Sequence, residues 1–149
     1  MKKILIVNSN YYKSISNNLV LCAKKDLKKE KFQISIIDVP GVFEIPFAIR
    51  KNIKKFDGFI ALGCVIKGET PHFDLICSST FNAILTLTIN FNKPIGNGII
   101  TAINLKQAYQ RSKNNLSSKK PNKGSEAAKA LISIFKNGTK KIKKLIPKN

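Results

Sequence analysis

Apolar residues fall into four short runs, separated by longer segments in which apolar and polar positions repeat at helical spacing. The runs cover residues 3–8, 32–39, 57–65 and 93–101. Several are rich in β-branched residues, which is typical of β-strands. The third run is the most apolar and does not alternate with polar positions, so we predict a central strand that is covered on both faces.

The segments between the runs predict helices. From about Ser16 onward, Leu19, Ala23 and Leu27 recur every four residues with lysines on the other side, which indicates an amphipathic helix. The other predicted helices cover residues 46–55, 71–90, 104–112 and 125–135.

The ends of two helices have specific signals. Thr70 followed by Pro71 predicts an N-cap and a first helical residue, and Ser125 with Glu126 predicts the start of the last helix. A polar segment at 113–123 precedes that helix, and a Lys-rich tail follows Asn137. A chain of 149 residues is long enough for one sizeable core, so we predict a single domain over residues 1–149.

The alternation of strands and helices predicts an α/β fold, with a parallel sheet, right-handed crossovers and helices on both faces. Ligands in such folds bind beyond the C-terminal ends of the strands. This rule selects residues 8–13, 40–44 and 64–72 and the segment from Asn97 onward. We expect these segments to converge, with a buried loop around Glu44.

Residues 64–72 are the first candidate for a phosphate site. They combine a strand end, the turn Lys67–Gly68–Glu69, and a helix start that carries His72, the only histidine. Free backbone N–H groups and the helix dipole favour an anion there. The structural alternative is an ordinary glycine turn with a capped helix and a surface histidine.

The formal net charge of +19, from 27 basic and 8 acidic residues, raises the possibility of a polyanionic partner. Only Arg50 and Arg111 are arginine, and the lysines are spread along the whole chain. Recognition of bases and phosphates usually favours arginine, so we do not expect nucleic-acid binding as the main function. A basic polyanion-binding module without catalysis is the alternative.

Three cysteines, Cys22, Cys64 and Cys77, form no CxxC pair, and we interpret them as small buried hydrophobes in a reducing compartment. With one histidine, a metal site is not expected. No apolar run approaches the roughly 18–20 residues that span a bilayer, and the N-terminus does not resemble a signal peptide. A cytoplasmic location is therefore expected.

Three motifs carry a family resemblance: PGVFEIPFAIRK at 40–51, LGCVIKGETPHFD at 62–74 and PNKGSEAA at 121–128. With their order and spacing, they resemble 6,7-dimethyl-8-ribityllumazine synthases over nearly the whole chain. The resemblance implies a flavodoxin-like three-layer sandwich with four parallel strands. It also implies a transferase in the penultimate step of riboflavin biosynthesis, without metal or redox cofactor. That enzyme condenses 5-amino-6-(D-ribitylamino)uracil with 3,4-dihydroxy-2-butanone 4-phosphate and releases phosphate and water.

The resemblance also assigns residues. It implies that Tyr11 stacks on the pyrimidine and that His72 transfers protons. The residues expected at the pyrimidine and the ribityl chain are Tyr11, Val42, Phe43, Glu44, Cys64, Val65, Ile66 and Asn97. Those expected at the phosphate are Lys67, Gly68, Glu69 and Thr70, together with Arg111 and Lys123 from the neighbouring subunit.

The chain departs from the family at two places. Many members have a phenylalanine of the adjacent subunit over the pyrimidine where this chain has Asn97, so stacking should depend more on Tyr11. The segment RSKNNLSSKKPNKG at 111–124 is about four residues longer than usual, which leaves Lys119 and Lys120 unaligned. This longer turn and a first strand close to Met1 predict a homopentamer instead of a sixty-subunit shell. Riboflavin synthase is a further candidate partner.

Overall fold

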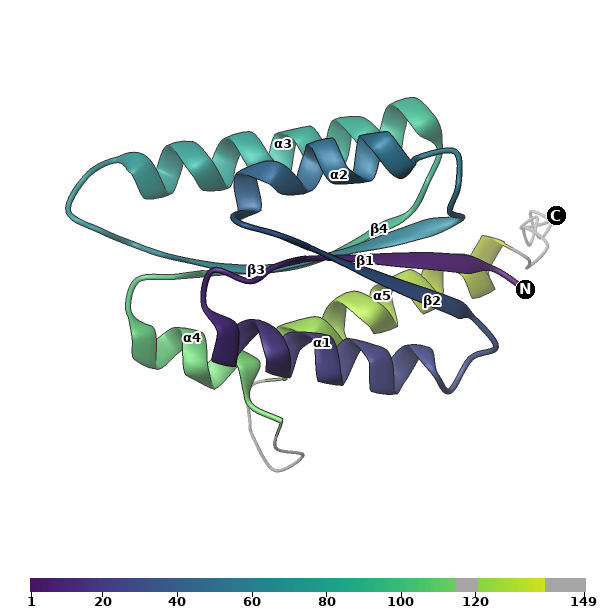
Figure 1. The fold of residues 1–149 in the computed structure, drawn as a ribbon, viewed down its shortest axis with the longest axis horizontal. Helices are drawn as coiled ribbons and strands as arrows, with labels where there is room; N and C mark the ends of the chain where they lie inside the picture. The colour runs from purple at the N-terminus through teal and green to yellow at the C-terminus, as the bar shows by residue number, and fades with distance from the viewer. Residues whose placement is uncertain (115–120, 139–149) are drawn as a thin grey trace, which may run out of the picture.

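A four-stranded parallel sheet runs through the middle of the molecule (Figure 1). The protein is described by a computed structural model that covers residues 1–114 and 121–138. The strands are β1 (Lys3–Ser9), β2 (Gln33–Val39), β3 (Gly58–Ile66) and β4 (Ile95–Ala102). Their order in the sheet is β2-β1-β3-β4, and every neighbouring pair is parallel. The predicted α/β fold with a parallel sheet is confirmed.

Helices cover both faces of the sheet (Figure 1). One layer contains α1 (Lys13–Leu27), α4 (Leu105–Ser112) and α5 (Lys123–Gly138), and the other contains α2 (Ile45–Asn52) and α3 (His72–Phe91). Each layer has its own apolar cluster against the sheet. The first seven residues of β3 are all buried, because the two clusters cover it from both sides, as its non-alternating sequence predicted.

Two helical segments begin earlier than predicted. The N–H of Ser16 donates to the carbonyl of Tyr12 at 2.9 Å, so α1 is already helical at Lys13 and Ser16 is not its start. Before α2, the residues Val42–Glu44 form a 3₁₀ turn, η1. Periodic apolar positions locate the body of a helix, whereas its first turn depends on backbone hydrogen bonds that leave little trace in the sequence.

Asn122 caps α5, so the predicted start at Ser125 is wrong. The Asn122 Oδ1 accepts hydrogen bonds from the backbone N–H groups of Gly124 at 2.8 Å and Ser125 at 3.2 Å. Its Nδ2 donates to the Ser112 carbonyl at 2.9 Å. One buried side chain therefore joins the end of α4 to the start of α5 and fixes the position of Lys123, the first residue of that helix.

The Ser125 side chain binds α1 instead. Its hydroxyl donates to the carboxylate of Asp26, which also accepts from Lys29. Burial alone would raise the pKa of Asp26, but the hydrogen bonds from Ser125 and Lys29 and the charges of Lys129 and Lys29 outweigh it and lower that pKa. Asp26 therefore stays ionised and ties α1 to the first turn of α5.

The cysteines match their prediction in two of three cases. Cys22 and Cys64 are buried free thiols, whereas Cys77 on α3 is only half-buried, so the prediction for Cys77 is wrong. Burial raises the pKa of Cys64 to about 12, which keeps this thiol protonated and unreactive. Within residues 1–114 and 121–138, no helix has the length and apolar character needed to span a bilayer. Lys119, Lys120 and the tail from 139 onward lie outside the described residues.

Candidate active site

The C-terminal ends of the four strands lie at the same edge of the sheet (Figure 1). There the Asn10 N–H donates to the Val39 carbonyl at 3.1 Å, and the Asn8 Nδ2 donates to the Asp38 carboxylate at 2.9 Å. These bonds join β1 to β2 directly below the loop that carries Tyr11. Tyr11 is 72% exposed, and its ring meets that of Tyr12 edge to face with 4.9 Å between the ring centroids, so Tyr11 is accessible to a planar ligand.

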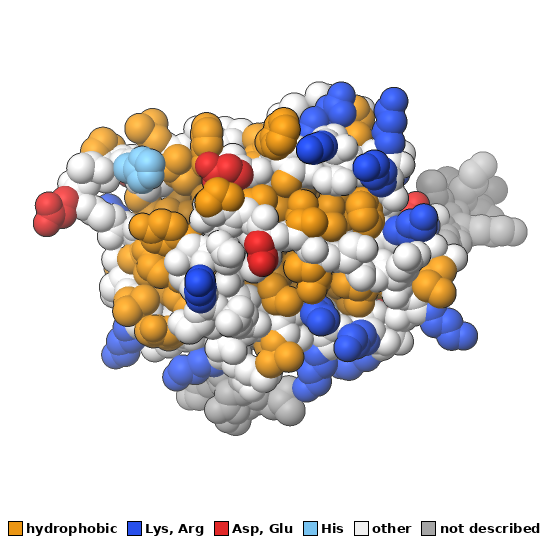
Figure 2. All heavy atoms as spheres, viewed as in Figure 1, with side chains coloured by type: hydrophobic (Ala, Val, Ile, Leu, Met, Phe, Trp, Pro, Cys, Tyr) orange, Lys and Arg blue, Asp and Glu red, His pale blue; other side chains and the backbone are white. Residues whose placement is uncertain are grey.

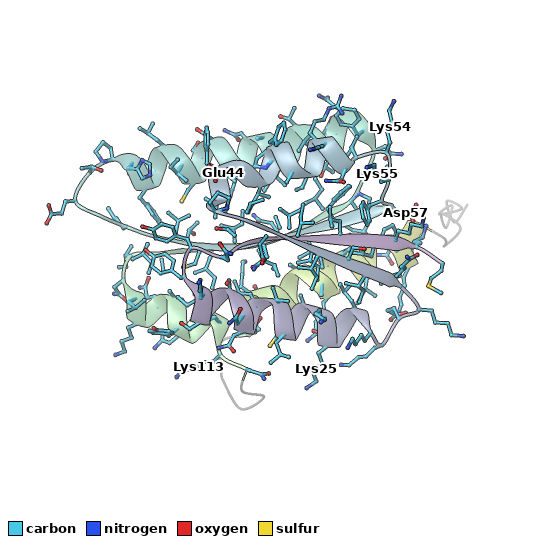
Figure 3. The ribbon with its side chains drawn as sticks, viewed as in Figure 1. Lys25, Glu44, Lys54, Lys55, Asp57 and Lys113 are labelled. Carbon is cyan, nitrogen blue, oxygen red and sulfur yellow. The ribbon has the colours of Figure 1, made fainter. Side chains whose placement is uncertain are left out.

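The turn η1 lies against the end of β3 because residue 63 is glycine. A Cβ at Gly63 would lie 2.7 Å from Val42 Cγ1, a distance that real Cβ atoms essentially never show, and a tight 3.0 Å from Ser9 Cβ. This close approach anchors Val42 and leaves Phe43 and Glu44 exposed. Glu44 lies at the surface near the start of α2 (Figure 3), so the expectation that its loop is buried is wrong for its side chain.

The segment after β3 is an open loop. The Lys67 N–H donates to the Ala102 carbonyl at 2.9 Å, which joins the ends of β3 and β4. The next three residues are exposed, and a Cβ at Gly68 would meet nothing within 4 Å. No crowding inside the described chain therefore requires a glycine at 68, and the space around it is free for a ligand.

The start of α3 differs by one residue from the prediction. Pro71 is the capping residue and His72 is the first residue of the helix, so Thr70 is not the N-cap. The Thr70 hydroxyl still accepts a long hydrogen bond of 3.4 Å from the His72 N–H. His72 is exposed next to apolar side chains (Figure 2). The helix dipole favours an anion beside it.

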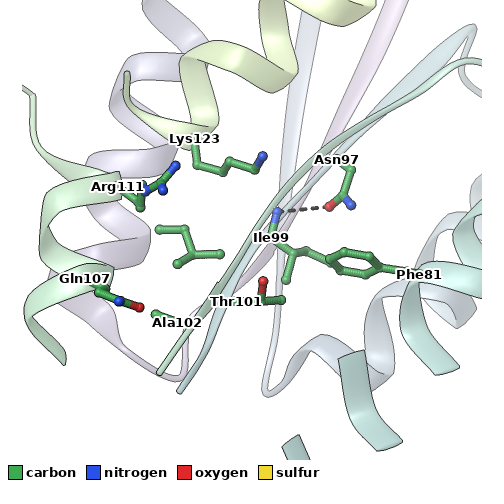
Figure 4. Close-up of a pocket in the computed structure, with 9 residues that line it drawn as sticks. Phe81, Asn97, Ile99, Thr101, Ala102, Gln107, Arg111 and Lys123 are labelled. Carbon is green, nitrogen blue, oxygen red and sulfur yellow. Dashed lines mark hydrogen bonds between the residues drawn. The ribbon is translucent and has the colours of Figure 1, made fainter. Parts of the chain in front are cut away.

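Asn97, Arg111 and Lys123 lie together in a different place, a cavity of about 240 Å³ between β4, α4 and α5 (Figure 4). Asn97 is the third residue of β4, so the prediction that it belongs to the strand-end loops is wrong. Arg111 has no carboxylate partner among the described residues. Lys123 forms a half-exposed ion pair with Glu126 at 3.3 Å, and such pairs are weak enough to yield to a ligand.

One chain therefore carries two separate groups of the predicted residues. We call residues 8–13, 40–44 and 64–72 the strand-end group, and the lining of the 240 Å³ cavity the β4 pocket. The strand-end group contributes no residue to the β4 pocket. Complete small-molecule sites usually enclose about 300–1,000 Å³. The β4 pocket is smaller than that range, which indicates part of a site.

The comparison with known families is decisive. The family described as 6,7-dimethyl-8-ribityllumazine synthase matches residues 1–137. The chain belongs to this lumazine synthase family. A lumazine synthase of Bartonella henselae is 43% identical over 136 residues, which cover 89% of this chain and 85% of the relative. The lumazine synthase of Erythrobacter litoralis is 38% identical over 91% of this chain and 95% of its own length. That of Campylobacter jejuni subsp. doylei is 37% identical over 94% of this chain and 91% of its own length.

Membership of the lumazine synthase family establishes the activity. The chain is a transferase of riboflavin biosynthesis that condenses 5-amino-6-(D-ribitylamino)uracil with 3,4-dihydroxy-2-butanone 4-phosphate. It works on small molecules and as an oligomer. The polyanion-binding alternative is not favoured, because the lysines labelled in Figure 3 lie on both helix layers and the basic groups in Figure 2 do not form one stripe.

Six of the residues that line the β4 pocket were not among the predicted site residues, and one of these six is aromatic. Phe81 of α3 reaches the pocket beside Asn97 and Ile99 (Figure 4). In the sequence it occupies an apolar position of a long helix, where a core side chain is the default interpretation. Only the packing of α3 beside β4 shows that this ring reaches a cavity with two cations.

Proposed function

We propose that the strand-end group of one subunit and the β4 pocket of its neighbour form one complete lumazine synthase active site. The observation that supports this most is the division of the site residues within one chain. Tyr11, Glu44 and His72 lie exposed in the strand-end group, whereas Arg111, the only arginine of the predicted site, lies with Lys123 in the β4 pocket. The strand-end group has no arginine that could grip a phosphate, and the β4 pocket has neither the exposed tyrosine nor the histidine.

The pyrimidine and its ribityl chain would bind in the strand-end group. Tyr11 would stack on the ring, since flat rings prefer offset or edge-on aromatic partners. The η1 residues Val42 and Phe43 would hold the ring edge, and Glu44 would accept hydrogen bonds from ribityl hydroxyls. Backbone groups of Cys64–Ile66 would bind the uracil edge, and Asn97 of the neighbour would supply an amide.

The ketone phosphate would bind between the loop and the neighbour. Backbone N–H groups of Gly68–Thr70 and the first turn of α3 would donate to the phosphate. Lys67 would contribute its side-chain charge, because its N–H is bound to the Ala102 carbonyl. Gly68 would allow close approach, and Glu69 would take part through its backbone only. Arg111 of the neighbouring subunit would grip two phosphate oxygens at once, and Lys123 would add a second positive charge.

Most of the acceleration would come from holding the two substrates together. The pyrimidine amine attacks the ketone carbonyl, and a Schiff base forms with loss of water. Elimination then breaks the C–O bond to phosphate, and the ribitylamino nitrogen attacks the carbonyl that this elimination leaves, with loss of a second water, to close the second ring. His72 would move protons in these steps, because an imidazole can accept and release protons near neutral pH. Mixing the purified protein with both substrates and recording the absorbance and fluorescence of the lumazine tests the activity directly.

Replacing His72 should reduce the rate without abolishing it. We expect His72→Ala to lower kcat about 10- to 100-fold, near the low end of general acid–base contributions, because substrate positioning remains. The matched control is Lys25→Ala, an exposed change on the opposite helix layer (Figure 3), which should leave kcat unchanged. A His72→Ala variant with the wild-type rate would remove His72 from proton transfer.

We infer a homopentamer in the cytoplasm, with riboflavin synthase as a candidate partner. Large apolar side chains on α2 and α3 are exposed, among them Phe47, Leu75 and Ile89 at 71%, 65% and 76%, and such surfaces mark association sites. The longer turn at 111–124 favours a pentamer over a shell. With 16.6 kDa per chain, mass photometry should give about 83 kDa for five copies. A particle near 1 MDa would contradict the pentamer.

A further inference from the structure

Among the described residues that line the β4 pocket, Phe81 supplies the one aromatic ring. The ring enters from α3, while Asn97, Ile99 and Thr101 line the pocket from β4 (Figure 4). Gln107, Arg111 and Lys123 come from the opposite helix layer. The described lining therefore combines an apolar ring on one side with two cationic side chains on the other. Such a pair of walls suits a ligand that has both a flat ring and an anionic group.

Asn97 cannot provide the flat wall itself. Its Oδ1 accepts a hydrogen bond of 3.1 Å from the backbone N–H of Ile99 (Figure 4). This bond ties the side chain to its own strand at the edge of the sheet, because β4 pairs with β3 alone among the described strands. The Nδ2 group is left as a hydrogen-bond donor. Residue 97 thus offers an amide, and any stacking surface in the β4 pocket must come from another residue.

Phe81 is placed to supply that surface. Part of the side chain packs against the apolar cluster between α2, α3 and the sheet, which holds the ring in position. The remainder is accessible and lines the β4 pocket beside Ile99. The face of an aromatic ring attracts the positive edge of another aromatic system and does not attract phosphate. Phe81 therefore favours contact with a ligand ring, whereas Arg111 and Lys123 favour contact with an anionic group.

We propose that Phe81 is a specificity-determining residue that covers the pyrimidine substrate bound in the strand-end group of the neighbouring subunit. It would take over the stacking role that Asn97 cannot perform, so the flat ring and the anionic group that suit the two walls belong to two different substrates. This inference rests on the shared active site proposed above. It assigns the two substrates to different walls of the β4 pocket, the pyrimidine to Phe81 and the ketone phosphate to Arg111 and Lys123.

The test is the separate determination of the two KM values. Phe81→Leu keeps an apolar side chain but removes the ring face, so the KM for the pyrimidine should rise about 10-fold. The KM for the ketone phosphate and kcat should stay within about twofold, since the phosphate contacts are unchanged. Phe81→Tyr, which keeps the ring, should restore the pyrimidine KM. In Phe81→Leu/Asn97→Phe, a ring supplied from β4 should restore it at least in part.

The control is Phe91→Leu on the same helix. The Phe91 ring does not line the β4 pocket, and the Arg50 guanidinium carbon lies 4.6 Å from its ring centroid. It should leave both KM values unchanged. Melting temperature and oligomer mass are recorded for each variant. If Phe81→Leu does not assemble, Phe81→Met, which has an apolar side chain of similar length, replaces it.

An unchanged pyrimidine KM in Phe81→Leu, or an equal rise in both KM values, would overturn the proposal. Arg111→Ala separates this failure from failure of the shared site. If Arg111→Ala raises the KM for the ketone phosphate while Phe81→Leu changes nothing, the shared site stands and the assignment of the ring is wrong. If neither variant changes a KM value, the shared site itself is wrong.

Discussion

Mixed oligomers of two impaired variants should recover more activity than either variant has alone. One variant is Arg111→Ala, which leaves the strand-end group intact. The other is Thr70→Ala/His72→Ala, which leaves the β4 pocket intact. If each active site takes its two parts from different subunits, random mixing in equal amounts makes about one quarter of the sites complete. The mixed sample should therefore reach about a quarter of the wild-type rate.

The measurement is lumazine formation after the two variants are co-expressed, or dissociated and reassembled together. All three substituted residues are exposed, so the variants should fold normally. The matched control combines all three substitutions in one chain and mixes that chain with either of the two variants. No interface in that mixture joins an intact strand-end group to an intact β4 pocket, so no activity should be recovered. Recovery no greater than the sum of the separate variants would show that each site belongs to one chain.

Much of the fold follows from the sequence because burial imposes it. The β3 strand is covered on both faces, and its run of apolar residues carries that information directly. The sequence contains less information about where a helix starts, because a single capping side chain that is not part of the periodic apolar pattern can determine the first residue. Asn122 illustrates this, since its amide caps α5 and also binds the end of α4, a contact between residues ten positions apart.

The strand-end group could be located from sequence for a topological reason. The ends of parallel strands meet at one edge, so Tyr11, Glu44 and His72 could be assigned to it from their positions after strands. The exposure of the Glu44 side chain could not be predicted from the sequence, because it depends on how η1 fits against Gly63. The β4 pocket was also beyond this rule. Asn97 points from inside a strand and Phe81 from a helix, so only their packing brings them together.

Close helix packing sets the position of Lys123, and one glycine makes it possible. Gly124 lies in the first turn of α5. A Cβ there would lie 2.2 Å from the carbonyl oxygen and 2.9 Å from the carbonyl carbon of Leu19 on α1. Backbone atoms cannot rotate away as a flexible side chain can. Any larger residue must therefore push α5 away from α1.

Gly124→Ala should accordingly be one of the most damaging single-methyl changes in the chain. Overpacking typically costs about 1–3 kcal/mol and occasionally more, and contact with backbone places this case at about 3 kcal/mol or above. The melting temperature should fall by about 6–12 °C at 2–4 °C per kcal/mol. Any assembled enzyme should also show a raised KM for the ketone phosphate, because Lys123 moves with the first turn of α5.

Gly138→Ala, in the same helix, is the control for helix propensity. A Cβ at that position meets no atom within 4 Å, so the change should alter stability by no more than about 0.5 kcal/mol. Both variants must be compared with wild type at one protein concentration, since assembly contributes to the apparent stability. Equal melting temperatures for the two variants would mean that α5 is not seated directly on the Leu19 backbone. The tight contact between α1 and α5 would then no longer explain how Lys123 is held at the β4 pocket.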